Sequence, residues 1–325
     1  MRYLKYLYWS LFPLLAACGT SDDGPDEAAV VQELERPYQA QAFLLRQPHD
    51  YNPDSIKLLT GDYQPLTNYE VPANLKPHGF WLKFEGPTWE SDRIGYRAYL
   101  DSRHRYDIFG KRTTGLVLDT VDLDYHKIHE WGSDILKVGS TLGMGSPAIY
   151  YQDSLYAWEN YAAKRVEIVQ SKGERAIFRY HIDGLRFADQ EMDLMLQISI
   201  AAGEYQTRNR IEVRRSTLAE PVFAAGIVAH LPTRLDTMLL GQQIIANFGL
   251  QSYHDEKLGM AVWTSDKYAL EVLQGTPLDS HVLTFRPSSG VAEYSFAAAW
   301  ERGPDPVQTQ AEFIKLLQAE LTTPQ

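Results

Sequence analysis

The chain has 325 residues, and its 42 acidic residues against 31 lysines and arginines give a formal net charge of −11. This balance argues against nucleic-acid binding, because phosphate recognition depends on basic surface. The single cysteine, Cys18, rules out a disulfide within the chain and a thiolate metal site, so a packed core must hold the fold. We expect no cofactor and no bound metal.

The first residues resemble a bacterial lipoprotein signal. Arg2 and Lys5 precede an apolar run at residues 7–15 that is too short to span a bilayer, and small residues stand before Cys18. We expect cleavage after residue 17 and acylation of Cys18; the alternative is an uncleaved N-terminal helix. Several acyl chains would anchor the protein stably in the cell envelope. The resemblance favours the outer membrane, on its periplasmic or surface face, because Gly19 replaces the aspartate that retains many lipoproteins at the inner membrane.

Composition divides the chain into four segments. Residues 1–17 form the expected signal peptide, and residues 18–33 form an acidic tether with too little apolar content to fold. Residues 34–77 are interrupted by six prolines, which predicts an irregular lead-in with one strand. Residues 78–325 are expected to form a single β-sandwich domain that includes a C-terminal helix.

Runs of β-branched and aromatic residues, separated by turn signals, begin at residue 79. Leu194, Leu196, Ile198 and Ile200 occupy one face and Asp193, Gln197 and Ser199 the other, as in a half-buried strand. Strands at this density predict an all-β fold of antiparallel sheets packed face to face. An apolar stripe after residue 306 predicts one helix near the end, with Asp305 as its cap. The other predicted strands cover residues 79–85, 89–101, 175–182, 223–230, 259–264, 269–273, 282–285 and 291–300.

Two of the predicted strands carry arginines on one face. Read as a strand, residues 89–101 place Arg93, Arg97, Tyr99 and Asp101 on the same side, where the guanidinium groups could bind carboxylates. Residues 207–214 place Arg208 and Arg210 on one side in the same way. If both faces line one cleft, the site is cationic and suits a uronic acid or a sulfated sugar. If they lie on opposite sides, each is a solvated edge.

Residues 119–139 combine two histidines with several carboxylates, a tyrosine, a tryptophan and a lysine. His126 and His129 are candidate proton carriers near neutral pH, and Tyr125, Glu130 or Lys137 could complete an acid–base pair. Two alternatives remain open. The histidines could bind a divalent metal together with Asp122 or Asp124, or the segment could be a charged surface loop.

The strings at residues 89–97, 107–111 and 131–139, together with the lipoprotein signal, resemble the bacterial lipoproteins called domain of unknown function 4861. The resemblance covers residues 75–315. These lipoproteins occur with polysaccharide-degrading enzymes, pectin-related ones included. The resemblance implies a large antiparallel β-supersandwich of the galactose-mutarotase type, which binds or processes sugars on a concave sheet face.

We therefore expect an envelope protein that binds and processes an acidic oligosaccharide or polysaccharide. Its chemistry could be β-elimination by a tyrosine or histidine, hydrolysis by two carboxylates drawn from Glu90, Asp92, Glu130 and Asp134, or mutarotation by a histidine and a carboxylate. The alternative is a glycan-binding lipoprotein without catalysis. Convergence of His126, His129, Glu130 and Asp134 with Asp92 and Arg93 in one pocket would favour an enzyme. Their spread across a surface would favour binding alone. The candidate catalytic residues are Asp92, Tyr125, His126, His129, Glu130 and Asp134; the candidate substrate-binding residues are Arg93, Arg97, Tyr99, Trp131, Lys137, Arg208 and Arg210.

Overall fold

The computed structural model describes residues 39–48, 50–52 and 63–323. The predicted signal peptide, Cys18 and the acidic tether lie outside the described residues. Among the helices of the described part, none has the length and apolar character needed to cross a membrane.

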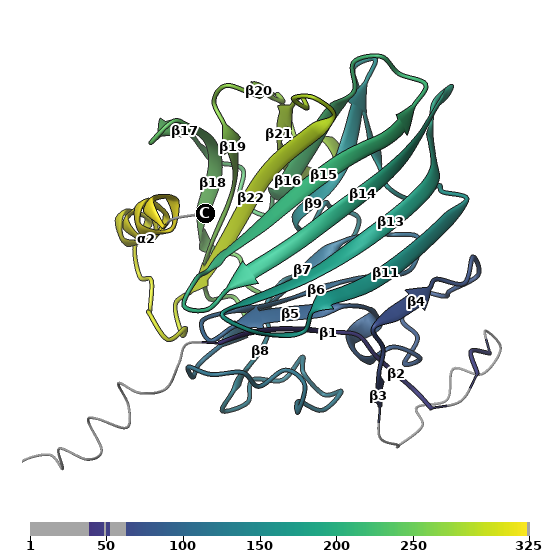
Figure 1. Cartoon of the computed structure of the whole chain (residues 1–325). Coiled ribbons are helices and arrows are strands. Elements are labelled where there is room, and N and C mark those ends of the chain that lie inside the picture. The colour runs from purple at the N-terminus through teal and green to yellow at the C-terminus, as the bar shows by residue number, and fades with distance from the viewer. Residues whose placement is uncertain (1–38, 49, 53–62, 324–325) are drawn as a thin grey trace, which may run out of the picture. The chain divides into compact units, whose positions relative to one another are not determined.

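A nine-stranded antiparallel sheet is the largest element of the fold (Figure 1). Its central strands are long because one face of each is apolar: on β14, Leu194, Leu196, Ile198 and Ile200 are all buried, as their alternation predicts. In spatial order the strands are β17 (Leu235–Leu239), β18 (Gln242–Leu250), β19 (Lys257–Ser265), β22 (Val291–Trp300), β15 (Gln206–Ser216), β14 (Gln190–Ala201), β13 (Arg175–Phe187), β11 (Ala163–Gln170) and β4 (Asn68–Glu70).

Two smaller antiparallel sheets and a short ribbon complete the β-structure. The six-stranded sheet runs β12 (Lys172–Gly173), β1 (Ala40–Phe43), β5 (Thr88–Ser91), β6 (Gly95–Ala98), β7 (Tyr106–Lys111) and β8 (Gly132–Asp134). The five-stranded sheet runs β10 (Ser154–Ala157), β9 (Met144–Tyr151), β16 (Val222–Val228), β21 (Ser280–Phe285) and β20 (Ala269–Val272). The ribbon pairs β2 (Leu45–Arg46) with β3 (Gln64–Pro65), and the helical elements are η1 (Lys83–Glu85), η2 (Pro277–Asp279) and α2 (Gln310–Thr322).

Aromatic contacts show that both smaller sheets pack on the nine-stranded sheet. The Trp89 ring on β5 lies 5.1 Å from Phe178 on β13, measured between ring centroids. The Phe285 ring on β21 lies 5.3 Å from Tyr294 on β22. The large buried core therefore lies between layered antiparallel sheets. The expected all-β sandwich with one short C-terminal helix is confirmed.

Two of the predicted strands are wrong. Residues 79–85 do not form a strand, because Phe84 and Glu85 adopt positive φ angles of 57° and 67° and form the turn η1. The predicted strand 89–101 is a hairpin of β5 and β6, since the Ser91 hydroxyl accepts the backbone N–H of Arg93 at 3.0 Å and closes a turn. Arg93 therefore lies in the turn and shares no strand face with Arg97.

The helix α2 begins later than expected. Thr309, not Asp305, caps it: the Thr309 hydroxyl accepts the backbone N–H of Glu312, and the Glu312 carboxylate accepts the backbone N–H of Thr309. Asp305 instead accepts hydrogen bonds from Arg93 Nη1 at 3.1 Å and from the Tyr205 hydroxyl at 3.0 Å. Within the expected lead-in, β1 pairs with β5 and so belongs to the six-stranded sheet.

Candidate functional site

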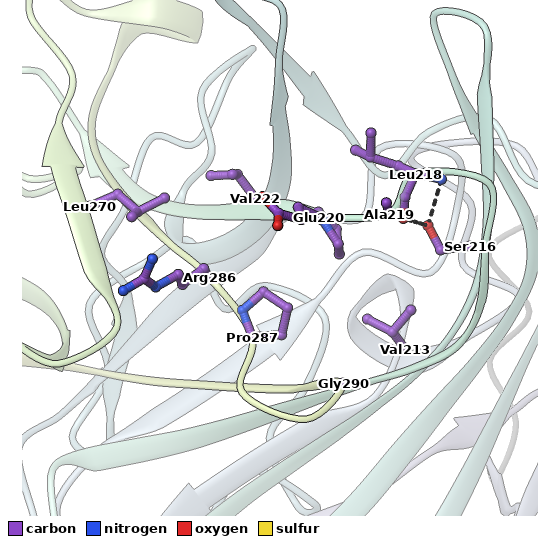
Figure 2. Close-up of a pocket in the computed structure, with 11 residues that line it drawn as sticks. Val213, Ser216, Leu218, Ala219, Glu220, Val222, Leu270, Arg286, Pro287 and Gly290 are labelled. Carbon is purple, nitrogen blue, oxygen red and sulfur yellow. Dashed lines mark hydrogen bonds between the residues drawn. The ribbon is translucent and has the colours of Figure 1, made fainter.

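One cavity of about 630 Å³ opens where β15, β16 and β20 meet (Figure 2). Glu220 and Arg286 are the ionisable residues among those that line it. None of the predicted site residues lies in its wall. It therefore offers room for a ligand but holds none of the residues that the sequence singled out for proton transfer.

Part of the predicted site gathers instead on the six-stranded sheet. On β6, Tyr96 and Ala98 point into the main core, so Arg97 between them points to the opposite face. Asp107 on β7 is the direct cross-strand partner of Arg97. The chain between β7 and β8 covers this face, held by the Glu90 carboxylate, which accepts the backbone N–H groups of Val117 and Leu118 at 3.0 and 2.8 Å.

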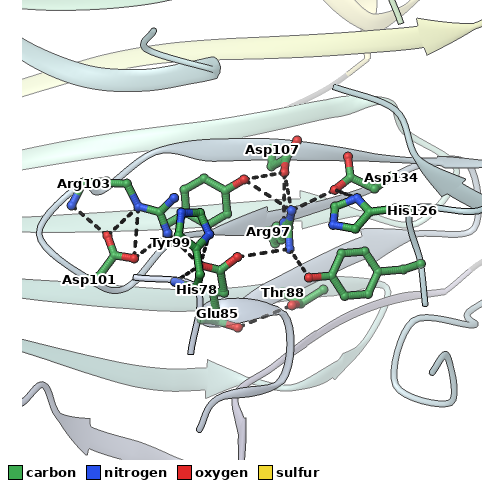
Figure 3. A network of polar contacts seen from close by, with 12 residues as sticks. His78, Glu85, Thr88, Arg97, Tyr99, Asp101, Arg103, Asp107, His126 and Asp134 are labelled. Carbon is green, nitrogen blue, oxygen red and sulfur yellow. Dashed lines mark hydrogen bonds and ion pairs between the residues drawn. The ribbon is translucent and has the colours of Figure 1, made fainter. Parts of the chain in front are cut away.

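Arg97 is the centre of a buried polar network on that face (Figure 3). Its side chain is 2% exposed. Nη2 donates to Asp107 Oδ2 at 2.6 Å and to Asp134 Oδ2 at 2.8 Å. Nη1 donates to the Tyr125 hydroxyl at 2.9 Å, and the Tyr99 hydroxyl donates to Asp107 Oδ2 at 2.8 Å. Arg97 therefore positions these groups and has no exposed surface with which to contact a ligand.

The charges in this network influence one another strongly. Burial opposes the charge of Arg97, but Asp107 and Asp134 hold the pKa of its guanidinium well above the ordinary value. Burial raises the pKa of Asp107 to about 6, and the nearby Asp134 contributes to the rise. Burial also raises the pKa values of the Tyr99 and Tyr125 hydroxyls, so both stay neutral; Tyr99 donates to Asp107, and Tyr125 accepts from Arg97.

His126 joins this network to solvent. Its Nδ1 lies 3.2 Å from Asp134 Oδ2, and its side chain is 53% exposed. The hydrogen bond to Asp134 raises the pKa of His126 above the ordinary value, against the opposing effect of partial burial. Because Nδ1 is engaged by the carboxylate, Nε2 is the nitrogen that can exchange a proton with a ligand.

His126 also lines a small pocket of about 160 Å³. On the wall of the same pocket lies Glu85, whose Oε2 accepts hydrogen bonds from Arg103 Nη2 at 2.6 Å and from the backbone N–H of His78 at 2.9 Å. Non-glycine residues with positive φ, here Phe84 and Glu85, are frequent at functional sites. The pocket thus presents an imidazole and a carboxylate to the same space. Its remaining lining residues are His78, Gly79, Phe80, Leu82, Phe84, Leu123 and Tyr125.

The structure brings together only part of the predicted site. Arg97, Tyr99, Tyr125, His126 and Asp134 converge, as the contacts above show. His129 Nε2 instead pairs with Asp124 Oδ1 at 3.3 Å, its ring stacks on Trp131 at 6.3 Å, and Glu130 is exposed beside it.

The other predicted residues have partners elsewhere. Asp92 accepts the backbone N–H of Gly203 at 2.6 Å and pairs with Arg93, away from the His126 pocket. Arg208 pairs with Glu204. Arg210 pairs with Glu212 at 3.2 Å and with Glu293 at 3.7 Å. Lys137 lies over the ring of Tyr253, which the sequence did not single out. These arginines therefore do not line one cationic cleft with His126. The expected convergence of both histidines, Glu130 and Asp134 with Asp92 and Arg93 in one pocket is not found.

Two residues of the network were missed from the sequence. Asp107 could have been found only by pairing β6 with β7, because its role comes from its register opposite Arg97. Glu85 was hidden by the incorrect strand at residues 79–85. For the metal alternative, the residues that the structure describes contain no group of three or more His, Cys, Asp or Glu side chains placed to hold an ion.

Comparisons with known proteins give one family. The chain matches the family described as "Domain of unknown function (DUF4861)" over residues 27–324. No curated protein matches it. Among solved structures, it is similar to a crystal structure titled "putative aldose 1-epimerase" from Klebsiella pneumoniae, with 9% identity, coverage of 86% of this chain and 95% of that chain, and a TM-score of 0.34. That likeness is too distant to bear on activity.

Proposed function

This chain belongs to the DUF4861 family, and we propose that it processes a saccharide by proton transfer through His126. The observation that carries the proposal is the contact of His126 with Asp134 at the edge of a pocket. Asp134 orients the imidazole and stabilises its protonated form, while Arg97 holds Asp134 from the other side. Imidazole groups held in this way serve as general acids and bases near neutral pH.

Several observations support a single sugar ring as the occupant of the pocket. About 160 Å³ is less than the roughly 300–1,000 Å³ typical of pockets for drug-sized ligands, so the space suits one ring or the end of a chain. Phe80, Phe84 and Tyr125 provide apolar surface, and Glu85 and His126 provide hydrogen-bonding groups. The resemblance to lipoproteins that occur with polysaccharide-degrading enzymes favours a carbohydrate over other small ligands.

The geometry favours proton transfer by histidine over hydrolysis by a pair of carboxylates. Of the four carboxylates considered for hydrolysis, Glu90 is fully buried against Lys111, and Asp134 is buried against Arg97. Asp92 and Glu130 do not line the pocket. In contrast, His126 and Glu85 share its wall. An imidazole and a carboxylate can together open the sugar ring that the pocket holds. In an elimination, His126 would instead take the C5 proton of a uronate on its exposed side, the C4–O bond would break, and a proton from solvent would go to the departing oxygen.

We also propose that Cys18 anchors the protein in the cell envelope. The support is the order of charged, apolar and small residues that precede it. Metabolic labelling with a fatty-acid analogue should mark the wild-type protein and leave Cys18→Ser unlabelled and released from membranes. Equal labelling of both proteins would contradict acylation at Cys18. It would have no bearing on the proposal for His126.

The function is tested by incubating the purified full chain with neutral and acidic oligosaccharides. Three readouts separate the reactions: absorbance of unsaturated uronates reports elimination, new reducing ends alone report hydrolysis, and exchange of anomers by NMR reports ring opening. We expect elimination or ring opening. Hydrolysis would show that a pair of carboxylates works elsewhere in the chain. Calorimetric binding without any of the three reactions would leave a glycan-binding lipoprotein.

A further inference from the structure

We propose that Tyr253 and Lys137 form a second sugar subsite beside His126, which selects a ring carrying an anionic group. This inference rests on the proposed function, because it names the substrate class of the same site. It concerns two side chains that play no part in the proton transfer. Lys137 follows β8 of the six-stranded sheet, Tyr253 lies in a turn of the nine-stranded sheet, and the fold brings them to one place.

The first step is that Tyr253 is held firmly next to the acid–base pair. It lies in the turn between β18 and β19, and its backbone N–H donates to Ile135 O at 2.7 Å. The neighbouring His254 Nε2 lies 2.9 Å from Ser133 Oγ on β8. Ser252 Oγ closes the turn by accepting the backbone N–H of Glu256 at 2.9 Å. The turn is therefore fixed to the strand that carries Asp134.

The second step is the exposure and orientation of the Tyr253 ring. Its centroid lies 5.7 Å from that of His126, and the planes meet at 29°. The tyrosine is nevertheless 40% exposed, so much of the ring stays in contact with solvent. The flat face of a sugar, with its C–H groups, packs well on exposed aromatic surface. A ring next to the one in the pocket would therefore meet Tyr253.

The third step is the charge of Lys137. Its side chain is exposed, and Nζ lies 5.3 Å from the centroid of the Tyr253 ring. Among the described residues, no carboxylate lies within ion-pair distance of it, unlike Arg97, Arg103 or Arg210. A cation–π contact at an exposed site is weak. Lys137 is thus free to move toward an anion.

The fourth step explains why an anionic group would bind beside the pocket and not inside it. Glu85 lines the pocket, and Asp134 and Asp107 lie behind His126. Arg97 is shared among these carboxylates and is not available to a second anion. A negatively charged ring would be repelled there, whereas it would be attracted at Lys137. The adjoining rings of an acidic oligosaccharide therefore fit the Tyr253 side of the site.

The experiment compares acidic and neutral forms of the same ligand. Trimers of galacturonate and of mannuronate, and their methyl esters, are titrated by calorimetry into the full chain and into K137M, K137R, Y253A and Y253F. We expect K137M to weaken binding of an acidic trimer by about fivefold and to leave its ester unchanged. K137R should bind like the wild type. Y253A should weaken both forms by roughly threefold to tenfold, and Y253F should not.

The possible results separate this proposal from the proposed function. Equal effects of K137M on trimer and ester, no effect on either, or no binding of any of the four ligands would overturn the subsite. Lys137-dependent binding without turnover would leave the subsite standing and contradict the proton-transfer function. Turnover that does not depend on Lys137 would contradict the subsite and leave the proton-transfer function standing.

Discussion

His126 Nδ1 lies 3.2 Å from Asp134 Oδ2, which joins a half-exposed imidazole to a carboxylate that is 2% exposed. The same oxygen accepts a hydrogen bond from Arg97 Nη2 at 2.8 Å. Asp134 is therefore fixed by a buried cation on one side and presents its charge to His126 on the other. This arrangement prepares the imidazole for proton exchange before any ligand arrives.

The pKa of His126 should fall when Asp134 loses its charge. In D134N the amide keeps the shape of the side chain, but it no longer stabilises the imidazolium. An NMR titration should therefore show the His126 midpoint at lower pH in D134N than in the wild type. D124N is the matched control, because Asp124 contacts His129, and the His126 midpoint should not move. An unchanged midpoint in D134N would contradict the role given to this contact.

Removing Arg97 should destabilise the fold severely. R97M leaves Asp107 and Asp134 buried without their cation, and breaking a buried ion pair in this way costs about 3–5 kcal/mol. R210M is the control, because Arg210 is 39% exposed and pairs with Glu212 at the surface, where such pairs contribute about 0–1 kcal/mol. Urea unfolding of the three proteins measures both values. Similar losses in R97M and R210M would disagree with the network described here.

Glu320 should make stability depend on pH. It lies on α2, where Oε2 accepts the backbone N–H groups of Tyr205 and Gln206, and burial raises its pKa from 4.5 to about 7. Between these values the folded protein binds more protons than the unfolded chain, so the free energy of unfolding falls as pH rises. In E320Q the free energy of unfolding should decrease less over this pH range. If the pH dependence of unfolding is the same in E320Q and in the wild type, the carboxyl has no such effect.

The strands were predictable where one face is buried. Val291–Trp300 forms β22 with the bounds read from the sequence, and residues 192–200 lie within β14. The hairpin at residues 88–98 was not predictable, because its turn depends on the backbone hydrogen bond that the Ser91 hydroxyl accepts from Arg93, which periodicity does not reveal. Position 95 has no room for a side chain, because a Cβ there would lie 2.4 Å from Leu118 Cδ1 in the folded protein. The sequence alone does not reveal this contact.

The candidate site, too, could be predicted from the sequence only in part. Tyr125, His126 and Asp134 lie within ten positions of one another, so their chemistry could be seen in the sequence. Asp107 depends on strand register, and Glu85 depends on a turn with positive φ. Tyr253 reaches the site because its turn docks on β8, where its neighbour His254 contacts Ser133 across 121 positions of sequence. Contacts over that separation follow from the layered sheets and not from any local pattern.

The most direct test compares turnover by the wild type, H126Q and H129Q on whichever oligosaccharide the panel shows to be a substrate. Gln preserves hydrogen bonding but cannot carry a proton. His129 is the matched control, because it lies three positions away and pairs with Asp124 outside the pocket. We predict that H126Q loses about 100-fold or more in kcat, while H129Q stays close to the wild type. A kcat of H126Q equal to that of the wild type would contradict proton transfer through His126.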